Sequence, residues 1–185
     1  MYRKYSEGII EVITGPMFSG KSEELLKRIR TLEYANYNII VIKPSFDTRF
    51  SKTKIVSRAG TEHDTHAIDD INSIYSLINE DTDAIIIDEA HFFNDKIIDI
   101  VDDLANKGFL VIVSGLDTDY KRRPFRIMAD IMSIAERVTK LWAVCVKCKN
   151  IASCTYRTSK EDQTLVLDDT NNYEARCRKC HNANK

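Results

Sequence analysis

The sequence lacks any run of about 20 consecutive apolar residues, which is the length that a membrane-spanning helix needs. Its first residues are polar and charged, without the apolar region of a secretion signal. We therefore expect a cytoplasmic protein with no membrane partner. A basic excess is absent too, because 27 Lys and Arg stand against 28 Asp and Glu. This balance argues against nonspecific binding to nucleic acid, so no nucleic-acid partner is expected.

What the sequence does contain is enough apolar material for a core. The chain has 185 residues, of which 43% are hydrophobic, so we expect one compact domain with a small appendage. It also has five cysteines. Since no export signal accompanies them, paired cysteines are better interpreted as metal ligands than as disulfides.

Short segments rich in β-branched residues alternate with segments of helical period. This alternation predicts an α/β fold, a mostly parallel sheet with helices on both faces. The polar segment 43–69 has no clear period and is predicted to be a long mobile loop. At residue 144 the chain changes to short polar segments between cysteines, which predicts domains at 1–143 and 144–185. The predicted strands are 9–14, 39–42, 83–88, 109–113 and 141–144, and the predicted helices 22–34, 95–106 and 125–136.

A phosphate-binding pattern lies between the first predicted strand and helix. The P-loop pattern G-x-x-x-x-G-K-[ST] is matched in full by Gly15, Pro16, Met17, Phe18, Ser19, Gly20, Lys21 and Ser22. Its glycines let backbone N–H groups face phosphate oxygens, and the helix that follows offers its positive end. We expect Lys21 to neutralise the β- and γ-phosphates of ATP, and the Ser22 hydroxyl to bind Mg²⁺. A chance glycine-rich turn is the alternative.

Asp88 and Glu89 end a predicted strand, at the place of a Walker B carboxylate. Asp88 would bind Mg²⁺, which leaves Glu89 to accept a proton from the attacking group. With Ala90 and His91 the pair spells the D-E-A-H sequence of a helicase family. Such a helicase needs two α/β domains and a more basic surface, so it fits poorly. A nucleotide-dependent switch, or a nucleic-acid-binding module that uses ATP, remains as the second alternative.

Two C-x-x-C motifs, with 28 residues between them, are formed by Cys145, Cys148, Cys177 and Cys180. Four thiolates suit a closed, tetrahedral, structural Zn²⁺ site. A metal is also physically sensible because about 40 residues make too little core to be stable alone. Unliganded thiols are the alternative, and His181 could replace Cys180 as a ligand. Cys154 is predicted to be a small buried residue.

Together these residues resemble the zinc-containing (type II) thymidine kinases, a family with a RecA-like P-loop domain and a small zinc-ribbon-like domain that carries a lid. The resemblance extends from about Ile10 to His181, with its motifs in the same order. It is carried by residues 15–25, Lys43-Pro44, Asp47-Thr48-Arg49, Asp88-Glu89, Phe92-Phe93, Gly115-Leu116-Asp117, Arg123-Pro124-Phe125 and 173–181.

The resemblance implies ATP-dependent phosphorylation of the 5′-hydroxyl of thymidine, or of deoxyuridine, in deoxynucleotide salvage. It implies that Glu89 is the general base, that Asp47 and Arg49 belong to the phosphate site, and that the chain forms a homotetramer. It explains the long spacing between the cysteine pairs as a lid over the thymine base. The residues implied for the nucleoside pocket and lid are Met17, Phe92, Leu116, Tyr120, Phe125, Thr155, Thr164, Leu165, Val166, Leu167, Asp168 and Tyr173.

Three positions depart from the family pattern. His91 stands where the family usually has Gln, Arg126 where Gly is common, and Asp168-Asp169 in a lid segment that is often rich in glycine. None of them removes a phosphate-site group, so they bear on substrate details rather than on the kinase assignment. For Phe92, Leu116 and Phe125, ordinary core packing is the alternative to a pocket.

Overall fold

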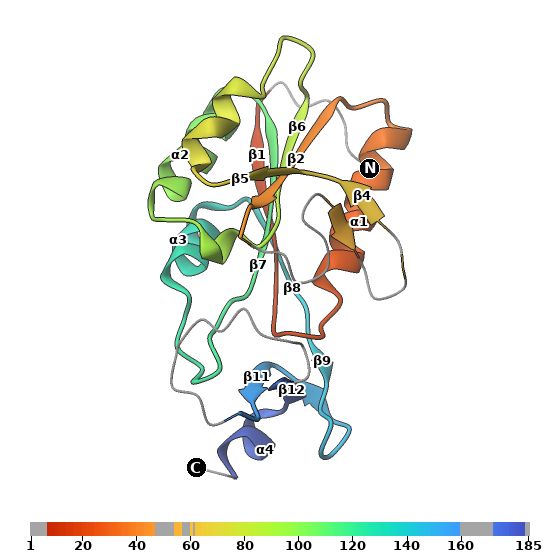
Figure 1. The fold of residues 1–185 in the computed structure, drawn as a ribbon, viewed down its shortest axis with the longest axis vertical. Coiled ribbons are helices and arrows are strands. Elements are labelled where there is room, and N and C mark those ends of the chain that lie inside the picture. Colours follow the sequence, from red (N-terminus) through yellow and green to blue (C-terminus); the bar gives the residue numbers. More distant parts are fainter. Residues whose placement is uncertain (1–6, 47–53, 57–59, 61, 160–171, 184–185) are drawn as a thin grey trace.

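A six-stranded sheet forms the centre of the molecule (Figure 1). The computed structural model describes residues 7–46, 54–56, 60, 62–159 and 172–183. The strand order is β5-β2-β6-β7-β1-β8, and all pairings within this sheet are parallel, as predicted. Its strands are β1 (Ile9–Thr14), β2 (Ile39–Pro44), β5 (His66–Ile68), β6 (Ala84–Ile87), β7 (Leu110–Gly115) and β8 (Arg137–Lys140).

Helices cover both faces of the sheet, which confirms the predicted fold class. Helix α1 (Lys21–Tyr34) lies on one face, and α2 (Lys96–Asn106) and α3 (Arg126–Ile134) lie on the other (Figure 1). The 3-10 helix η1 (Ile71–Ser76) packs with α2. Every residue of β6 is buried, as expected for an apolar strand in a sheet covered on both sides.

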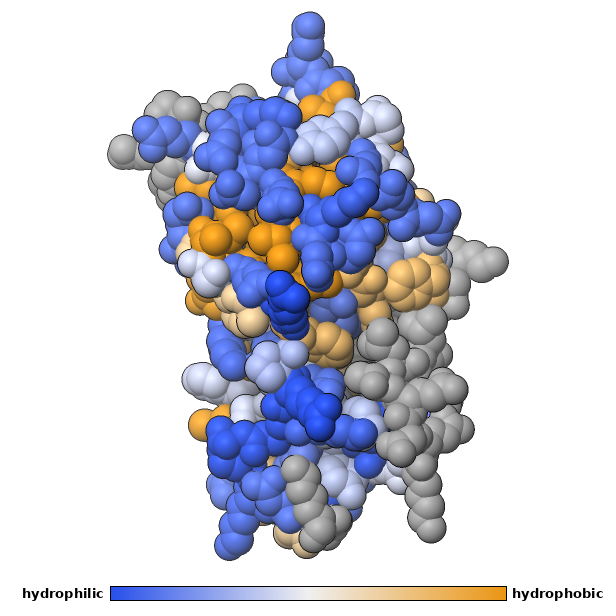
Figure 2. Space-filling model, turned by 90° about the vertical axis from the view of Figure 1, so that its left-hand side faces the viewer, coloured by the Kyte–Doolittle hydropathy of each residue, from blue (hydrophilic) through white to orange (hydrophobic). Residues whose placement is uncertain are grey.

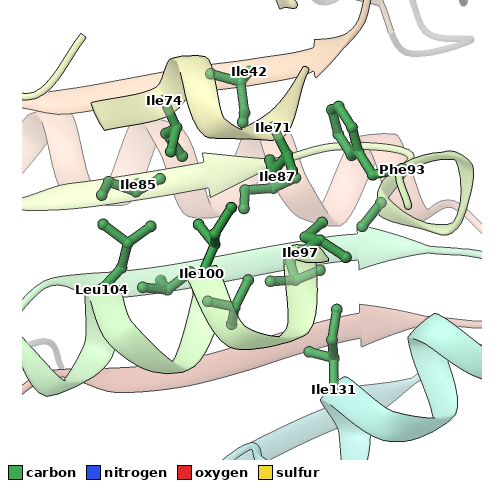
Figure 3. Close-up of a cluster of buried hydrophobic side chains, with 14 of the residues drawn as sticks. Ile42, Ile71, Ile74, Ile85, Ile87, Phe93, Ile97, Ile100, Leu104 and Ile131 are labelled. Atoms are coloured by element: carbon green, nitrogen blue, oxygen red, sulfur yellow. The ribbon is translucent and has the colours of Figure 1, made fainter. Parts of the chain in front are cut away.

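Alternate side chains of the four inner strands, β1, β2, β6 and β7, enter different cores. On the face of α1, Ile86 packs in one cluster with Leu25 and Leu26. On the opposite face, Ile85 and Ile87 enter the cluster shown in Figure 3. This period of two is the geometry of a pleated strand. The labelled members of the second cluster are Ile42, Ile71, Ile74, Ile85, Ile87, Phe93, Ile97, Ile100, Leu104 and Ile131.

The prediction of a last sheet strand at 141–144 was wrong. The last strand of the sheet is β8, which pairs with the outer side of β1. Ala143–Val144 instead form β9, which pairs antiparallel with β10 (Ile151–Ala152). β8 is an edge strand, and three of its four side chains are exposed. Its sequence, Arg-Val-Thr-Lys, therefore carries no apolar run by which it could be recognised.

The prediction of one long loop at 43–69 was wrong for the described residues of that segment. They contain β5 and an antiparallel pair formed by β3 (Lys54–Val56) and β4 (Glu62–Asp64). Each of these strands has three residues, which is too short for a period to be seen in the sequence.

The C-terminal part adjoins the carboxyl end of β1, beside the P-loop (Figure 1). It contains β9, β10, the antiparallel pair β11 (Cys154–Arg157) and β12 (Tyr173–Arg176), and α4 (Arg178–Asn182). Figure 2 shows the side on which α2 and α3 lie; there apolar residues show between polar ones, whereas the C-terminal end is mainly hydrophilic. The division into 1–143 and 144–185 stays a prediction. None of the helices in the described part is long and apolar enough to cross a bilayer.

Candidate active site

The carboxyl ends of β1, β6 and β7 meet at one edge of the sheet, because these strands are parallel and adjacent. The P-loop follows β1, the acidic pair follows β6, and Leu116 follows β7. The Thr14 hydroxyl donates to the carbonyl oxygen of Gly115 at 2.9 Å, which joins the ends of β1 and β7. The phosphate-binding pattern and both carboxylates therefore lie at the edge where open α/β sheets bind ligands.

The P-loop has the curled backbone that its sequence predicts. Gly15 and Gly20 have φ angles of 143° and 83°, and a Cβ on Gly15 would lie 2.5 Å from the carbonyl oxygen of Leu141. The Lys21 ammonium donates to the carbonyl oxygen of Pro16 at 2.9 Å, so it lies over the loop. Because α1 begins at Lys21, the positive end of this helix also faces the P-loop. The arrangement can bind phosphate groups.

Glu89 has an uncommon backbone conformation. Its φ and ψ are 50° and 39°, the left-handed region that a residue with a side chain rarely adopts. It directly precedes the 3-10 helix η2 (Ala90–Phe92), and its N–H donates to Oδ1 of the nearly buried Asp88 at 2.9 Å. Strained residues of this kind cluster at active sites. Phe18, Asn36, Arg122 and Lys149 also have positive φ angles, so it is this conformation together with the place of Glu89 at the carboxyl end of β6 that makes it a candidate catalytic residue.

His91 is the centre of an aromatic cluster. Its buried ring lies 4.1 Å from the ring of Phe92 and 4.8 Å from that of Phe125, centroid to centroid. Its Nδ1 accepts the Leu116 N–H at 3.2 Å and lies 3.5 Å from Oε2 of Glu89. Phe46, which sequence reasoning missed, packs edge-on against Phe92 at 5.3 Å.

The C-terminal part contacts the P-loop and the loop that follows β7. The Met17 N–H donates to Oγ1 of Thr155 at 3.0 Å, which connects the P-loop to β11. Tyr120 and Tyr173 both lie beside Arg157, whose guanidinium carbon is 3.8 Å and 5.4 Å from the two ring centroids. Sequence reasoning missed Arg157, because a single Arg in a short strand matches no motif.

Seven predicted site residues lie outside the described part of the chain, so their roles remain predictions. They are Asp47, Arg49, Thr164, Leu165, Val166, Leu167 and Asp168.

The four cysteines of the two C-x-x-C motifs come together. Their sulfur atoms all lie within 4.8 Å of one another, and Cys148 and Cys177 are 3.6 Å apart. Around a tetrahedral Zn²⁺ with Zn–S bonds of about 2.3 Å, sulfurs would be about 3.8 Å apart, so the cluster fits this ion. His181 lies outside the cluster, with its Nε2 2.9 Å from the carbonyl oxygen of Tyr120. Cys154 is buried apart from the cluster, as predicted.

The thiols of this cluster differ in their affinity for protons. Burial raises the pKa of Cys145, but hydrogen bonds from the backbone N–H groups of Cys177, Cys148 and Lys147 outweigh it and bring this pKa to about 6. The backbone N–H of Cys180 lowers the pKa of Cys177, whereas side-chain hydrogen bonds with Cys177 and Cys148 raise that of Cys180 to about 12. Backbone N–H groups that favour thiolates suit a metal site, because metal ligands must be deprotonated.

Comparisons with known proteins agree with this geometry. The family model described as thymidine kinase matches residues 8–181. The thymidine kinase of Metamycoplasma arthritidis is 60% identical over 184 residues, which cover 99% of this chain and 95% of that protein. That of Mycoplasma mobile is 53% identical, over 98% of this chain and 90% of the relative. That of Mesomycoplasma hyopneumoniae is 50% identical, over 98% and 99%. This chain therefore belongs to the thymidine kinase family, and its four-cysteine cluster fits the zinc-containing type.

Proposed function

We propose that this chain transfers the γ-phosphoryl group of ATP to the 5′-hydroxyl of thymidine, with deoxyuridine as a second candidate substrate. The observation that supports this most is the placement of a complete P-loop and the strained Glu89 at the same edge of the sheet. Phosphoryl transfer depends mainly on positioning and on charge stabilisation, and this edge offers groups for both. Membership of the thymidine kinase family supports the choice of nucleoside.

The P-loop amides and Lys21 would bind the β- and γ-phosphates of ATP. Ser22 and Asp88 offer the oxygen donors that Mg²⁺ prefers, so the residues present fit this ion. Bound Mg²⁺ would neutralise charge that develops on the transferring phosphoryl group. We assign Asp47 and Arg49 to the same phosphate site on the strength of the family resemblance.

Glu89 would act as the general base. It accepts the proton of the 5′-hydroxyl while that oxygen forms a bond to the γ-phosphorus. The bond from the γ-phosphorus to the β–γ bridging oxygen breaks, and ADP leaves with the electron pair. Lys21 and the loop amides stabilise the charge that develops in this step.

The nucleoside would bind between the two parts of the chain. Met17, Phe92, Leu116, Tyr120 and Phe125 supply apolar and aromatic faces from the sheet part, which suit a pyrimidine ring. From the C-terminal part, Thr155 and Tyr173 would contact the base, and Thr164, Leu165, Val166, Leu167 and Asp168 would form the lid.

The four-cysteine cluster would bind one structural Zn²⁺ and thereby fix both ends of the lid segment. Four sulfur ligands leave no open coordination position, so we assign this ion no catalytic step. We also propose a cytoplasmic homotetramer, which rests on the family resemblance alone. Light scattering coupled to gel filtration measures the oligomeric state.

Incubation with [γ-³²P]ATP, Mg²⁺ and a panel of nucleosides tests the proposed reaction. The expected product is labelled thymidine 5′-monophosphate, with deoxyuridine as the other acceptor. Release of labelled phosphate that DNA or RNA stimulates, with no labelled nucleoside, would contradict the proposal. That result would favour the nucleic-acid-dependent ATPase, whereas ATP hydrolysis without any acceptor would favour a nucleotide switch.

A further inference from the structure

Arg157 is a buried cation whose place the phosphoryl-transfer chemistry does not explain. It is the last residue of β11, and only 6% of it is exposed. Removal of a guanidinium from water is costly unless other groups replace the lost hydration. The groups that contact the guanidinium of Arg157 therefore indicate its role.

Two tyrosine rings flank the guanidinium. Its central carbon is 3.8 Å from the centroid of the Tyr120 ring and 5.4 Å from that of Tyr173. Its Nη2 also donates to the hydroxyl oxygen of Tyr173 at 3.0 Å. At such distances the face of an aromatic ring attracts a cation electrostatically. Among the described contacts, ring faces of both tyrosines and the phenol oxygen of Tyr173 therefore contribute to holding the guanidinium.

The two rings belong to different parts of the chain. Tyr120 lies in the connection from β7 to α3, at the carboxyl edge of the sheet, whereas Tyr173 begins β12. Arg157 and Tyr173 are directly opposite each other in the β11–β12 pair. Arg157 therefore connects a loop of the sheet to the strand that follows the lid segment.

A second contact on the same strand face joins the same two parts. Thr155 precedes Arg157 by two residues, so both side chains lie on one face of β11. Thr155 accepts the Met17 N–H of the P-loop, and Arg157 lies against Tyr120. This face of β11 thus meets the sheet part at two places, both at the proposed nucleoside site.

We propose that Arg157 is a positioning residue that holds the rings of Tyr120 and Tyr173 in place beside the nucleoside pocket, and thereby sets the affinity for thymidine. This inference rests on the proposed function, because it assigns the pocket to a nucleoside. Arginine suits the role better than lysine, since its planar group can lie against a ring and donate a directed hydrogen bond at once. Neither contact involves the P-loop phosphate groups, so ATP affinity should be independent of Arg157.

Steady-state kinetics of Arg157→Met tests this role. We expect the thymidine KM to rise about tenfold, as for the loss of a desolvated cation–π contact. The ATP KM and the zinc content should match those of the wild type, and kcat should change far less than the thymidine KM. Arg30→Met is the matched control, because Arg30 is exposed on α1 and bonds only its own helix in the contacts described.

Arg157→Lys separates positioning from folding. Lysine keeps the charge and a donor for Tyr173 but loses the planar stack, so the thymidine KM should lie between those of the wild type and Arg157→Met. If Arg157→Met fails to fold, Arg157→Lys decides: a raised thymidine KM with intact zinc and ATP KM supports the role. A wild-type thymidine KM in the folded variant, or an equal rise of the ATP KM, would overturn it.

The wild-type assay separates this inference from the proposed function. If the wild type forms no labelled thymidine monophosphate, the proposed function itself fails. If the wild type is active and both Arg157 variants retain its thymidine KM, only the role of Arg157 is refuted.

Discussion

The sheet part and the C-terminal part of this chain are stabilised in different ways. In the described residues, the sheet lies between clusters of eighteen and eleven buried apolar residues. The C-terminal cluster has four, three alanines and Cys145, and Cys177 and Cys180 pack against it. Apolar burial of about 25 cal/mol per Å² can stabilise the first part, but three alanines contribute little. The difference predicts that the C-terminal part depends for its stability on a metal ion bound by the four cysteines.

The two parts also carry different residues of the proposed active site. The sheet part carries the P-loop, Asp88 and Glu89, whereas the C-terminal part carries Thr155, Arg157 and Tyr173. We therefore expect changes in the sheet part to affect turnover or global stability. Changes in the C-terminal part should affect nucleoside affinity and zinc content.

Removal of a zinc ligand should have the largest effect. Cys145→Ser replaces the fully buried thiol of the cluster, so zinc content and thymidine-dependent activity should both be lost. ATP affinity and the far-UV circular dichroism of the sheet should remain. Elemental analysis and equilibrium binding measure these quantities. Cys154→Ala is the control and should retain its zinc. Wild-type zinc content and activity in Cys145→Ser would contradict the proposal that the C-terminal part depends on bound zinc.

Glu89→Gln should lower kcat about a thousandfold, because the amide cannot accept the 5′-hydroxyl proton. Its thymidine and ATP dissociation constants, measured by calorimetry, should stay within a few-fold of the wild type. The exposed Glu80→Gln serves as the control. Turnover within tenfold of the wild type would end the assignment of Glu89 as the base.

Ile86→Ala should lower the free energy of unfolding of the sheet part by about 2–5 kcal/mol. The reason is that the side chain of Ile86 on β6 is fully buried against α1. Denaturant titration followed by circular dichroism measures this loss. Zinc content should not change below the unfolding transition. Loss of zinc in the still-folded variant would show that metal binding by the C-terminal part depends on the apolar core of the sheet part, which our comparison does not predict.

Thr155→Val should have the smallest effect, since it removes one hydrogen bond, to the Met17 N–H. An unmatched donor costs about 1–3 kcal/mol, so the thymidine KM should rise about fivefold to a hundredfold. Kinetic titration of thymidine measures this rise. Ser153→Ala, an exposed change next to the same strand, should leave the KM unaltered. An unchanged KM in Thr155→Val would remove Thr155 from the pocket.

The sequence predicts the parts of the fold that have a strong local signal. The strands β1, β2, β6 and β7 are runs of apolar residues, and the P-loop pattern lies between β1 and α1. The edge strand β8 was missed because exposed strands have polar side chains. β3, β4 and β5 were missed because three residues show no period.

The site residues, too, could be predicted only where the sequence carries a local signal. Glu89 could be proposed from its place after a strand, but its left-handed backbone follows from tertiary packing and has no local signal. From the sequence, His91 is only a departure from the family pattern, whereas the structure shows its ring packed among aromatic rings and hydrogen-bonded to the Leu116 N–H. Arg157 could not be predicted, because its partners Tyr120 and Tyr173 come from other elements of the chain.

A crystal structure with thymidine and a non-hydrolysable ATP analogue tests the central claim most directly. The account predicts a carboxylate oxygen of Glu89 within about 3.2 Å of the 5′-oxygen of thymidine. The γ-phosphate of the analogue should lie against Lys21 and the P-loop amides. A nucleoside bound away from Glu89, or phosphates bound elsewhere on the chain, would contradict it.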